Sequence, residues 1–91
     1  DPEVFNHKIM AYVSITTQSE KYPGIYTLSE KMPQVLECHH ISGRESLILK
    51  IAASSIPDLD KTVEKLSRFG ETKTSIVLSS PIKKVVFEPL K

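Results

Sequence analysis

Several features that this sequence lacks narrow the folds and functions open to it. Its single cysteine, Cys38, excludes a framework of internal disulfides and fits a reducing compartment. No apolar run approaches the roughly 18 residues of a membrane-crossing helix, and no charged segment followed by an apolar one indicates a signal peptide. We therefore expect a cytoplasmic protein with no membrane partner.

The sequence also lacks a strong net charge and any recognisable catalytic motif. The formal net charge is +1, and the basic residues form no block, so a DNA-binding surface on this chain alone is not expected. We find no glycine-rich phosphate loop, no paired-carboxylate motif and no set of nucleophile, base and orienting residue. The sequence thus predicts no catalytic residue, no cofactor and no metal site.

The residues that are present suit one small domain. The chain of 91 residues is 40% hydrophobic and 25% charged, as globular proteins are, and it is near the size where oligomerisation often adds stability. Because it has no initiator Met, we expect it to be part of a longer protein. We predict the end of an interdomain linker at residues 1–7, a domain at 8–81 and a tail at 82–91, with a short edge strand at 83–87.

The segment from Glu37 to Ile51 organises the rest of the chain. It reads as a strand, a tight turn and a second strand, in which Gly43 supplies the positive φ that a two-residue hairpin turn needs. The second strand is apolar on both of its faces, because Leu47 and Ile48 alternate in direction. A strand with two apolar faces has to be covered twice.

Hydrophobic periodicity predicts the remaining elements. A second helix, after Ser55, has the clearest signals, because Ser55 and Asp58 have the spacing of a capping box and Gly70 follows the helix end. Its apolar stripe is Leu59, Val63, Leu66 and Phe69. The other predicted elements are a helix at 23–31 and strands at 9–16, 35–41, from the Gly43 turn to 52, and 72–78.

The order of these elements is β-α-β-β-α-β, which predicts an α+β fold of the ferredoxin-like type. Right-handed crossovers place both helices on one face of a four-stranded antiparallel sheet. Tyr12, Ile48 and Val77 would then add apolar surface to the face that the helices leave open. A symmetric dimer that packs sheet against sheet, or joins the sheets at their edges, would cover it.

Several segments also resemble a known family. The matching stretches are 1–3, 35–39, 42–43 and 69–81, and they resemble the C-terminal regulatory domain of the Lrp/AsnC (leucine-responsive, or feast-famine) transcription factors. The resemblance implies a ferredoxin-like domain that dimerises through its sheets into a dimeric α+β barrel and assembles further into tetramers or octamers. It also implies an N-terminal helix-turn-helix that binds DNA, which is absent from this chain.

The resemblance further implies a site for a small effector, typically an amino acid, where dimers meet. Its candidate residues are Gly43, Arg44, Glu45 and Ser46 in the turn, and Thr72, Thr74 and Ser75 on the fourth strand. The family's turn often reads Gly-Asp-aromatic-Asp, so Arg44 places a cation where an anion is common. Either Glu45 accepts from the ligand's ammonium group, or Arg44 clamps its carboxylate. Alternatively, the turn is solvated and binds nothing.

Three neighbouring residues, Cys38, His39 and His40, also carry reactive side chains. Adjacent strand residues point to opposite faces, so the two histidines cannot bind one metal together. They are either structural or surface residues, or they contact an effector or transfer a proton. Cys38 is expected to be a buried, unreactive thiol.

Two other functions stay open. The first is a small dimeric α+β barrel enzyme resembling the sirohaem decarboxylases, in which His39 or His40 would donate a proton and Arg44 would hold a substrate carboxylate. The second is a stand-alone amino-acid-sensing module with no DNA-binding domain. The leading interpretation is an effector-sensing and oligomerisation domain of a transcription regulator.

Overall fold

Strands with apolar residues on the core side alternate along the chain with two amphipathic segments, which form helices. The computed structural model describes residues 8–44 and 46–84. The elements are β1 (Ile9–Thr16), the short 3-10 helix η1 (Ser19–Lys21), α2 (Tyr22–Lys31), β2 (Val35–His40), β3 (Leu47–Ala53), α3 (Ile56–Leu66), the 3-10 helix η2 (Ser67–Phe69) and β4 (Glu71–Ile76).

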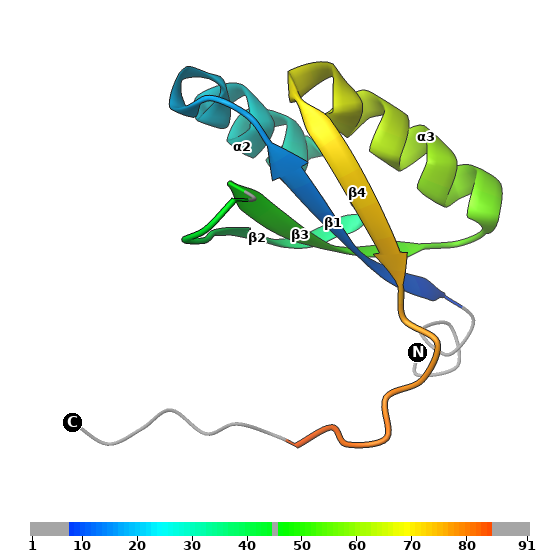
Figure 1. The fold of residues 1–91 in the computed structure, drawn as a ribbon. Helices are drawn as coiled ribbons and strands as arrows, with labels where there is room; N and C mark the ends of the chain where they lie inside the picture. Colours follow the sequence, from blue (N-terminus) through cyan, green and yellow to red (C-terminus); the bar gives the residue numbers. More distant parts are fainter. Residues whose placement is uncertain (1–7, 45, 85–91) are drawn as a thin grey trace.

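The four strands form one sheet in the order β2-β3-β1-β4, and each neighbouring pair is antiparallel. Both helices lie on the same face of this sheet (Figure 1). The arrangement confirms the predicted ferredoxin-like α+β fold, with its split β-α-β order and two helices covering one face. No helix of the described residues covers the opposite face, which we call the open face.

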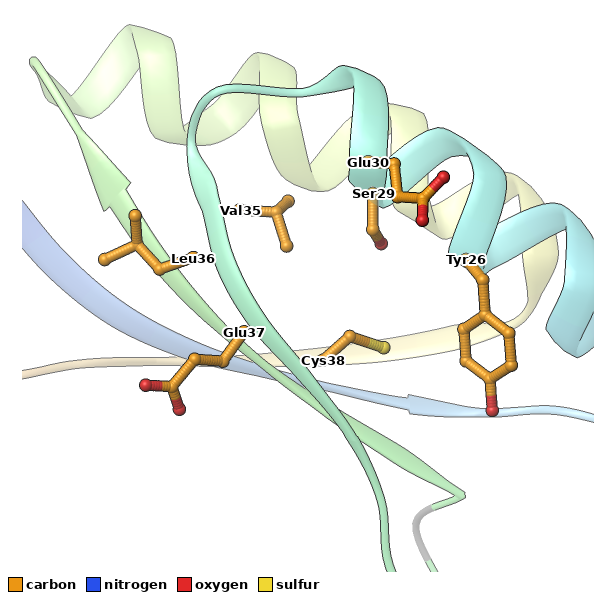
Figure 2. A pocket seen from close by; sticks show the side chains of 7 residues that line it. All are labelled: Tyr26, Ser29, Glu30, Val35, Leu36, Glu37 and Cys38. Atoms are coloured by element: carbon orange, nitrogen blue, oxygen red, sulfur yellow. The ribbon is translucent and has the colours of Figure 1, made fainter.

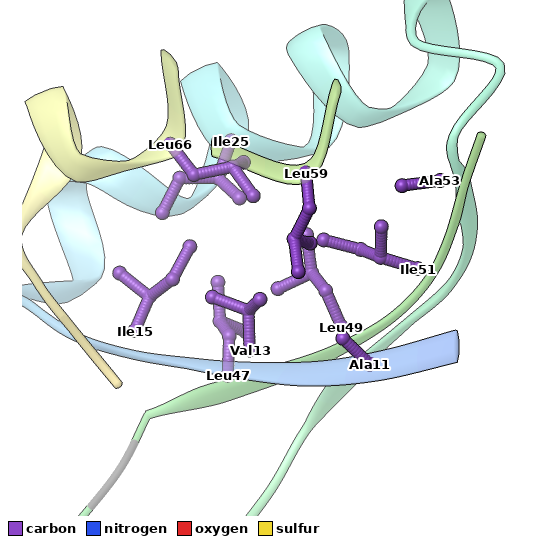
Figure 3. Packing of buried hydrophobic residues seen from close by; sticks show 10 residues of the cluster. All are labelled: Ala11, Val13, Ile15, Ile25, Leu47, Leu49, Ile51, Ala53, Leu59 and Leu66. Atoms are coloured by element: carbon purple, nitrogen blue, oxygen red, sulfur yellow. The ribbon is translucent and has the colours of Figure 1, made fainter. Parts of the chain in front are cut away.

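The core lies between the sheet and the helices (Figure 3). Every second residue of β1 and β3 points into it, as the two-residue repeat of a strand requires. Ile25 of α2 and Leu59 and Leu66 of α3 close it from above. The buried strand residues of this cluster are Ala11, Val13, Ile15, Leu47, Leu49, Ile51 and Ala53.

The capping signals of the second helix are confirmed. The Ser55 hydroxyl accepts a hydrogen bond from the Asp58 backbone N–H at 3.1 Å, which satisfies one of the free donors at the helix start. The Asp58 carboxylate accepts in turn from the Ser54 N–H at 2.9 Å, one residue before the cap. Val63 and Phe69 of the predicted stripe are only partly buried against the core, and Thr62 is buried instead.

The predicted two-residue hairpin turn is wrong. β2 ends at His40 and β3 begins at Leu47, and the Ile41 N–H donates to the Ser46 carbonyl at 3.1 Å. The connection is therefore a wider loop, because the backbone pairing stops at Ile41 and Ser46. Gly43 has the expected positive φ, at 105°.

The fourth strand is also shorter than the prediction of 72–78. It ends at Ile76, and Leu78 is 94% exposed. Val77 still donates its N–H to the Met10 carbonyl at 2.8 Å, so it continues the alternation of β4 beyond the strand's end. Residues 83–84 are not in a strand, and the rest of the predicted edge strand, 85–87, lies outside the described residues.

Gly70 follows the helical segment as predicted, but for a different physical reason. Its φ of 167° is extended, so it does not form the left-handed cap typical of glycine. A Cβ at this position would instead overlap the Thr16 carbonyl oxygen and lie 2.7 Å from the Thr17 Cβ. The absence of a side chain lets the chain entering β4 pass directly beside the end of β1.

The open face mixes apolar and charged side chains. The register pairs Tyr12 with Lys50 and Ser75, and it pairs Ile48 with Ser14 and His39, so all of these residues share this face. Tyr12 is 43% exposed although it lies on a central strand. The predicted second apolar surface therefore exists, but it is interrupted by polar groups.

Candidate functional site

A cavity of about 240 Å³ lies where the end of β1, the beginning of β4 and the loop 41–46 come together. The register places Ser14 opposite Lys73 and Thr16 opposite Glu71, on the open face of the sheet. Arg44 reaches the same cavity from the loop. The lining residues are Ser14, Thr16, Arg44, Glu71, Thr72 and Lys73.

The loop 41–46 is held in place by one serine. The Ser46 N–H donates to the Ile15 carbonyl at 3.1 Å, and the Ser46 hydroxyl donates to the Thr17 carbonyl at 3.0 Å. The same hydroxyl accepts from the Thr17 N–H at 3.4 Å. These bonds fix the loop to the end of β1, and this brings Arg44 beside the start of β4.

The cavity combines both signs of charge with hydroxyl groups. Arg44 and Lys73 supply cations, and Glu71 supplies an anion. A zwitterionic ligand needs donors for its carboxylate and an acceptor for its ammonium group. A guanidinium can bind a carboxylate through two parallel hydrogen bonds, which an ammonium side chain does not do. The lining therefore has the groups that an amino acid would require.

The structure brings together two of the seven predicted site residues, Arg44 and Thr72, in this cavity. Thr72 lies opposite Ile15, so strand alternation directs its side chain to the helix side, and Thr74 opposite Val13 follows the same direction. Ser75 lies on the open face opposite Tyr12.

The other predicted residues belong to the loop. Gly43 is exposed in it, and a Cβ added at this glycine would meet no other atom within 4 Å. The hydroxyl of Ser46 is already used to anchor the loop. Glu45 lies outside the described residues. The role predicted for Glu45 stays a prediction, and among the described residues Glu71 supplies a carboxylate to the cavity lining.

Ser14, Thr16, Glu71 and Lys73 were not predicted as site residues. A signal for two of them was present, because Ser14 and Thr16 are polar residues at alternate positions of an otherwise apolar first strand. Their common direction, away from the core, follows from the two-residue repeat. Glu71 and Lys73 could be found only through the register that pairs them with these two residues.

The two neighbouring histidines point to opposite faces, as predicted. His39 pairs with Ile48, and its Nε2 lies 2.8 Å from a Glu37 carboxylate oxygen. This hydrogen bond, more than the nearby Lys50, lowers the pKa of Glu37. His40 packs beside Tyr22 of α2, with ring centroids 5.2 Å apart. Neither histidine lines the cavity that contains Arg44.

Cys38 is half-buried beneath α2, on the helix side of β2. Burial raises the pKa of its thiol, an effect only partly offset by the nearby Ser29 hydroxyl. The neutral thiol is the less reactive form. Within residues 8–44 and 46–84, no three His, Cys, Asp or Glu residues gather as metal ligands, and neither helix has the length and apolarity to cross a bilayer.

The comparison with protein families agrees with this fold. The model of the Lrp/AsnC ligand binding domain matches residues 10–87, nearly the whole chain. The chain belongs to the Lrp/AsnC family. The resemblance found in the sequence is thereby confirmed, and the Lrp/AsnC match includes all four strands, the loop 41–46 and the cavity beside it.

Individual relatives are distant in sequence. The regulatory protein AsnC of Escherichia coli strain K12 is 24% identical over 90 residues, which cover 93% of this chain and 59% of AsnC. The chain thus spans less than two thirds of that relative. AsnC is named as a regulatory protein, and a second relative, YezC of Bacillus subtilis, is named as an HTH-type transcriptional regulator.

Solved structures share the fold. LrpC of Bacillus subtilis superposes with a TM-score of 0.80 at 23% identity, covering 92% of this chain and 60% of LrpC. A transcriptional regulator of Neisseria meningitidis, solved as a complex with L-methionine, superposes with a TM-score of 0.79 at 22% identity. That match covers 98% of this chain and 61% of the regulator.

Proposed function

We propose that this chain is the effector-sensing and oligomerisation domain of an Lrp/AsnC-type transcription regulator, with an amino acid as the effector. DNA would be bound by a helix-turn-helix domain that precedes Asp1 in the full-length protein. The chain would act in the cytoplasm, where a free amino acid can reach both domains. The family membership and the L-methionine complex of the Neisseria regulator support the sensing role.

The observation that carries the proposal is the cavity between Arg44, Glu71 and Lys73. Its charges suit the two ends of an amino acid, and it opens on the face of the sheet that no helix covers. A second copy packed there would close the cavity and exclude water, which strengthens each charged contact. The effector would then bind one assembly more tightly than another, and this difference is what shifts an equilibrium between assemblies.

Self-association is part of the proposal. Tyr12, Ile48 and the nearby Val77 give the open face apolar side chains, and Lys50, which pairs with Tyr12, lies among them. Interfaces between proteins commonly combine apolar and polar side chains in this way. We expect a homodimer through this face, and further assembly of dimers as the family resemblance implies.

The enzyme alternative has less support from the side chains. A proton donor in a substrate site should lie beside the group that holds the substrate. His39 instead binds Glu37, His40 packs on Tyr22, and neither shares the cavity of Arg44. The stand-alone sensing module differs from the main proposal only in what precedes Asp1 in the full protein.

Isothermal titration with the common amino acids, beginning with L-methionine, tests the proposal. We expect at least one of them to bind, and Arg44→Ala to weaken its affinity by roughly tenfold to a hundredfold, as loss of a charged hydrogen bond does. Arg68→Ala is the matched control, because Arg68 is exposed in η2 and does not line the cavity. Absence of binding by every amino acid, or equal affinity in the Arg44 variant, would contradict this function.

A further inference from the structure

A second cavity, of about 330 Å³, lies between α2 and the edge strand β2 (Figure 2). It is on the helix side of the sheet and shares no lining residue with the cavity of Arg44. The pairing of β2 with β3 shifts by one residue between Val35 and Glu37, which leaves Leu36 exposed at this edge. Its lining residues are Tyr26, Ser29, Glu30, Val35, Leu36, Glu37 and Cys38.

The hydroxyl of Ser29 makes no well-formed hydrogen bond among the described residues, although Ser29 is only 8% exposed. Its polar neighbour in the cavity is the Cys38 thiol, a weak hydrogen-bonding group whose pKa the hydroxyl lowers. Figure 2 shows its side chain pointing from α2 into the space above Cys38. The buried hydroxyl of the other helix behaves differently, because Thr62 donates to the Asp58 carbonyl one turn earlier, at 2.9 Å. A buried polar group without a partner is costly, so a group that enters the cavity and bonds Ser29 would be favoured.

The remaining lining restricts the chemistry of such a group. Tyr26 and Val35 give apolar surface, whereas the Leu36 side chain points away from the space under α2 (Figure 2), and no Lys, Arg or His of the described residues lines the cavity. Glu30 places a carboxylate between Ser29 and Tyr26 at the rim, whereas the Glu37 carboxylate points away to the other side of β2 (Figure 2). This lining disfavours an anion and favours a cation with an apolar body.

We propose that the cavity between α2 and β2 is a second small-molecule site, which binds a primary amine carrying a small apolar group. Its ammonium group donates to the Ser29 hydroxyl and to the Glu30 carboxylate, and its apolar part contacts Tyr26 and Val35. The site is distinct from the proposed amino-acid site and does not depend on it. It would not take a zwitterion well, because the cavity offers no cationic side chain for a carboxylate.

Titration of the full chain with 2-phenylethylamine, followed by amide chemical shifts, tests this proposal. We expect shifts centred on Ser29, Val35 and Cys38, a weaker response to 2-phenylethanol and none to phenylacetate. Ser29→Ala and Glu30→Gln should each weaken binding about tenfold, as the loss of a charged hydrogen bond does. Glu64→Gln, at an exposed glutamate of α3, is the matched control and should bind as the parent does.

Two further measurements separate binding from a change in folding. Ser29→Ala should raise the melting temperature, because it removes an unpartnered buried hydroxyl, while it weakens binding of the amine. The amine should also slow alkylation of Cys38 by iodoacetamide in the parent and not in Ser29→Ala. No saturable shifts at millimolar amine, shifts centred outside the cavity, or unchanged affinity in Ser29→Ala would overturn the proposal.

Discussion

At the scale of single residues, Ser46 anchors the loop that carries Arg44 of the proposed amino-acid site. Its backbone and hydroxyl make three hydrogen bonds to the end of β1, on Ile15 and Thr17. Its role in binding the effector stays a prediction, and its hydroxyl bonds Thr17 at the end of β1. Ser46 therefore acts on Arg44 through the position of the loop.

Ser46→Ala should lower the free energy of unfolding by about 1 kcal/mol, the usual net value of one partly buried hydrogen bond. Urea unfolding followed by circular dichroism measures this change. Ser42→Ala, at an exposed position of the same loop, should change it by less than about 0.5 kcal/mol. Equal effects of the two substitutions would show that Ser46 does not anchor the loop.

The free energy of unfolding should depend on pH through the carboxyl group of Asp58. The Ser54 N–H, followed by the Gln34 side chain, lowers the pKa of the Asp58 carboxyl, and Ser54 and Gln34 each donate to it at 2.9 Å. The pKa of Asp58 is lower in the folded chain than in the unfolded one. The ionised carboxylate therefore stabilises the fold above about pH 4, and this stabilisation is lost as the pH falls through the folded value.

Asp58→Asn should therefore reduce the loss of stability in acid. Urea midpoints measured between about pH 2 and about pH 7 should fall less steeply below about pH 4 in the variant than in the parent. Asp60→Asn, at an exposed position on the same helix, should keep the parent's slope. A variant at Asp58 with the parent's acid profile would show that these hydrogen bonds do not shape it.

At the scale of elements, the sequence predicted most where local and tertiary signals agree. Helix α3 was predictable because its N-terminal cap, its apolar stripe and the glycine that follows the helical segment all indicate the same helix. The loop between β2 and β3 was not, because Gly43 indicates a positive φ but does not reveal how many residues surround it. The register shift near Leu36 also left no trace in the sequence pattern.

The junction between η2 and β4 depends on Gly70. Gly70→Ala should lower the free energy of unfolding by about 3 kcal/mol, because the new methyl group would overlap the backbone of Thr16, which has little freedom to move. Gly43→Ala is the matched control, and it should cost only about 1 kcal/mol from its positive φ. Chemical unfolding measures both, and an equal cost would contradict the close approach at Gly70.

At the scale of the whole molecule, the sequence predicted the fold and the existence of an uncovered face, but only part of the site. Arg44 and Thr72 were found from the resemblance, whereas Glu71 and Lys73 required the register of β4 against β1. Pairing between distant strands sets that register, so no local pattern shows it. The open face carries this cavity and the apolar side chains near Tyr12, so the proposed sensing and the proposed self-association would share one surface.

A charged side chain at position 12 of the open face should prevent self-association without unfolding the domain. Tyr12→Glu puts a carboxylate on a central strand of the open face, where burial against a second copy would be strongly unfavourable. The helix side of the sheet is untouched, so the variant should stay folded. Glu20→Gln, an exposed substitution in η1, is the control and should assemble as the parent does.

Sedimentation equilibrium across micromolar concentrations tests the central claim, that this chain meets a second copy through its open face, most directly. We expect the parent to sediment as a dimer or a larger assembly, and folded Tyr12→Glu to sediment as a monomer. A parent chain that stays a folded monomer throughout this range would contradict the account.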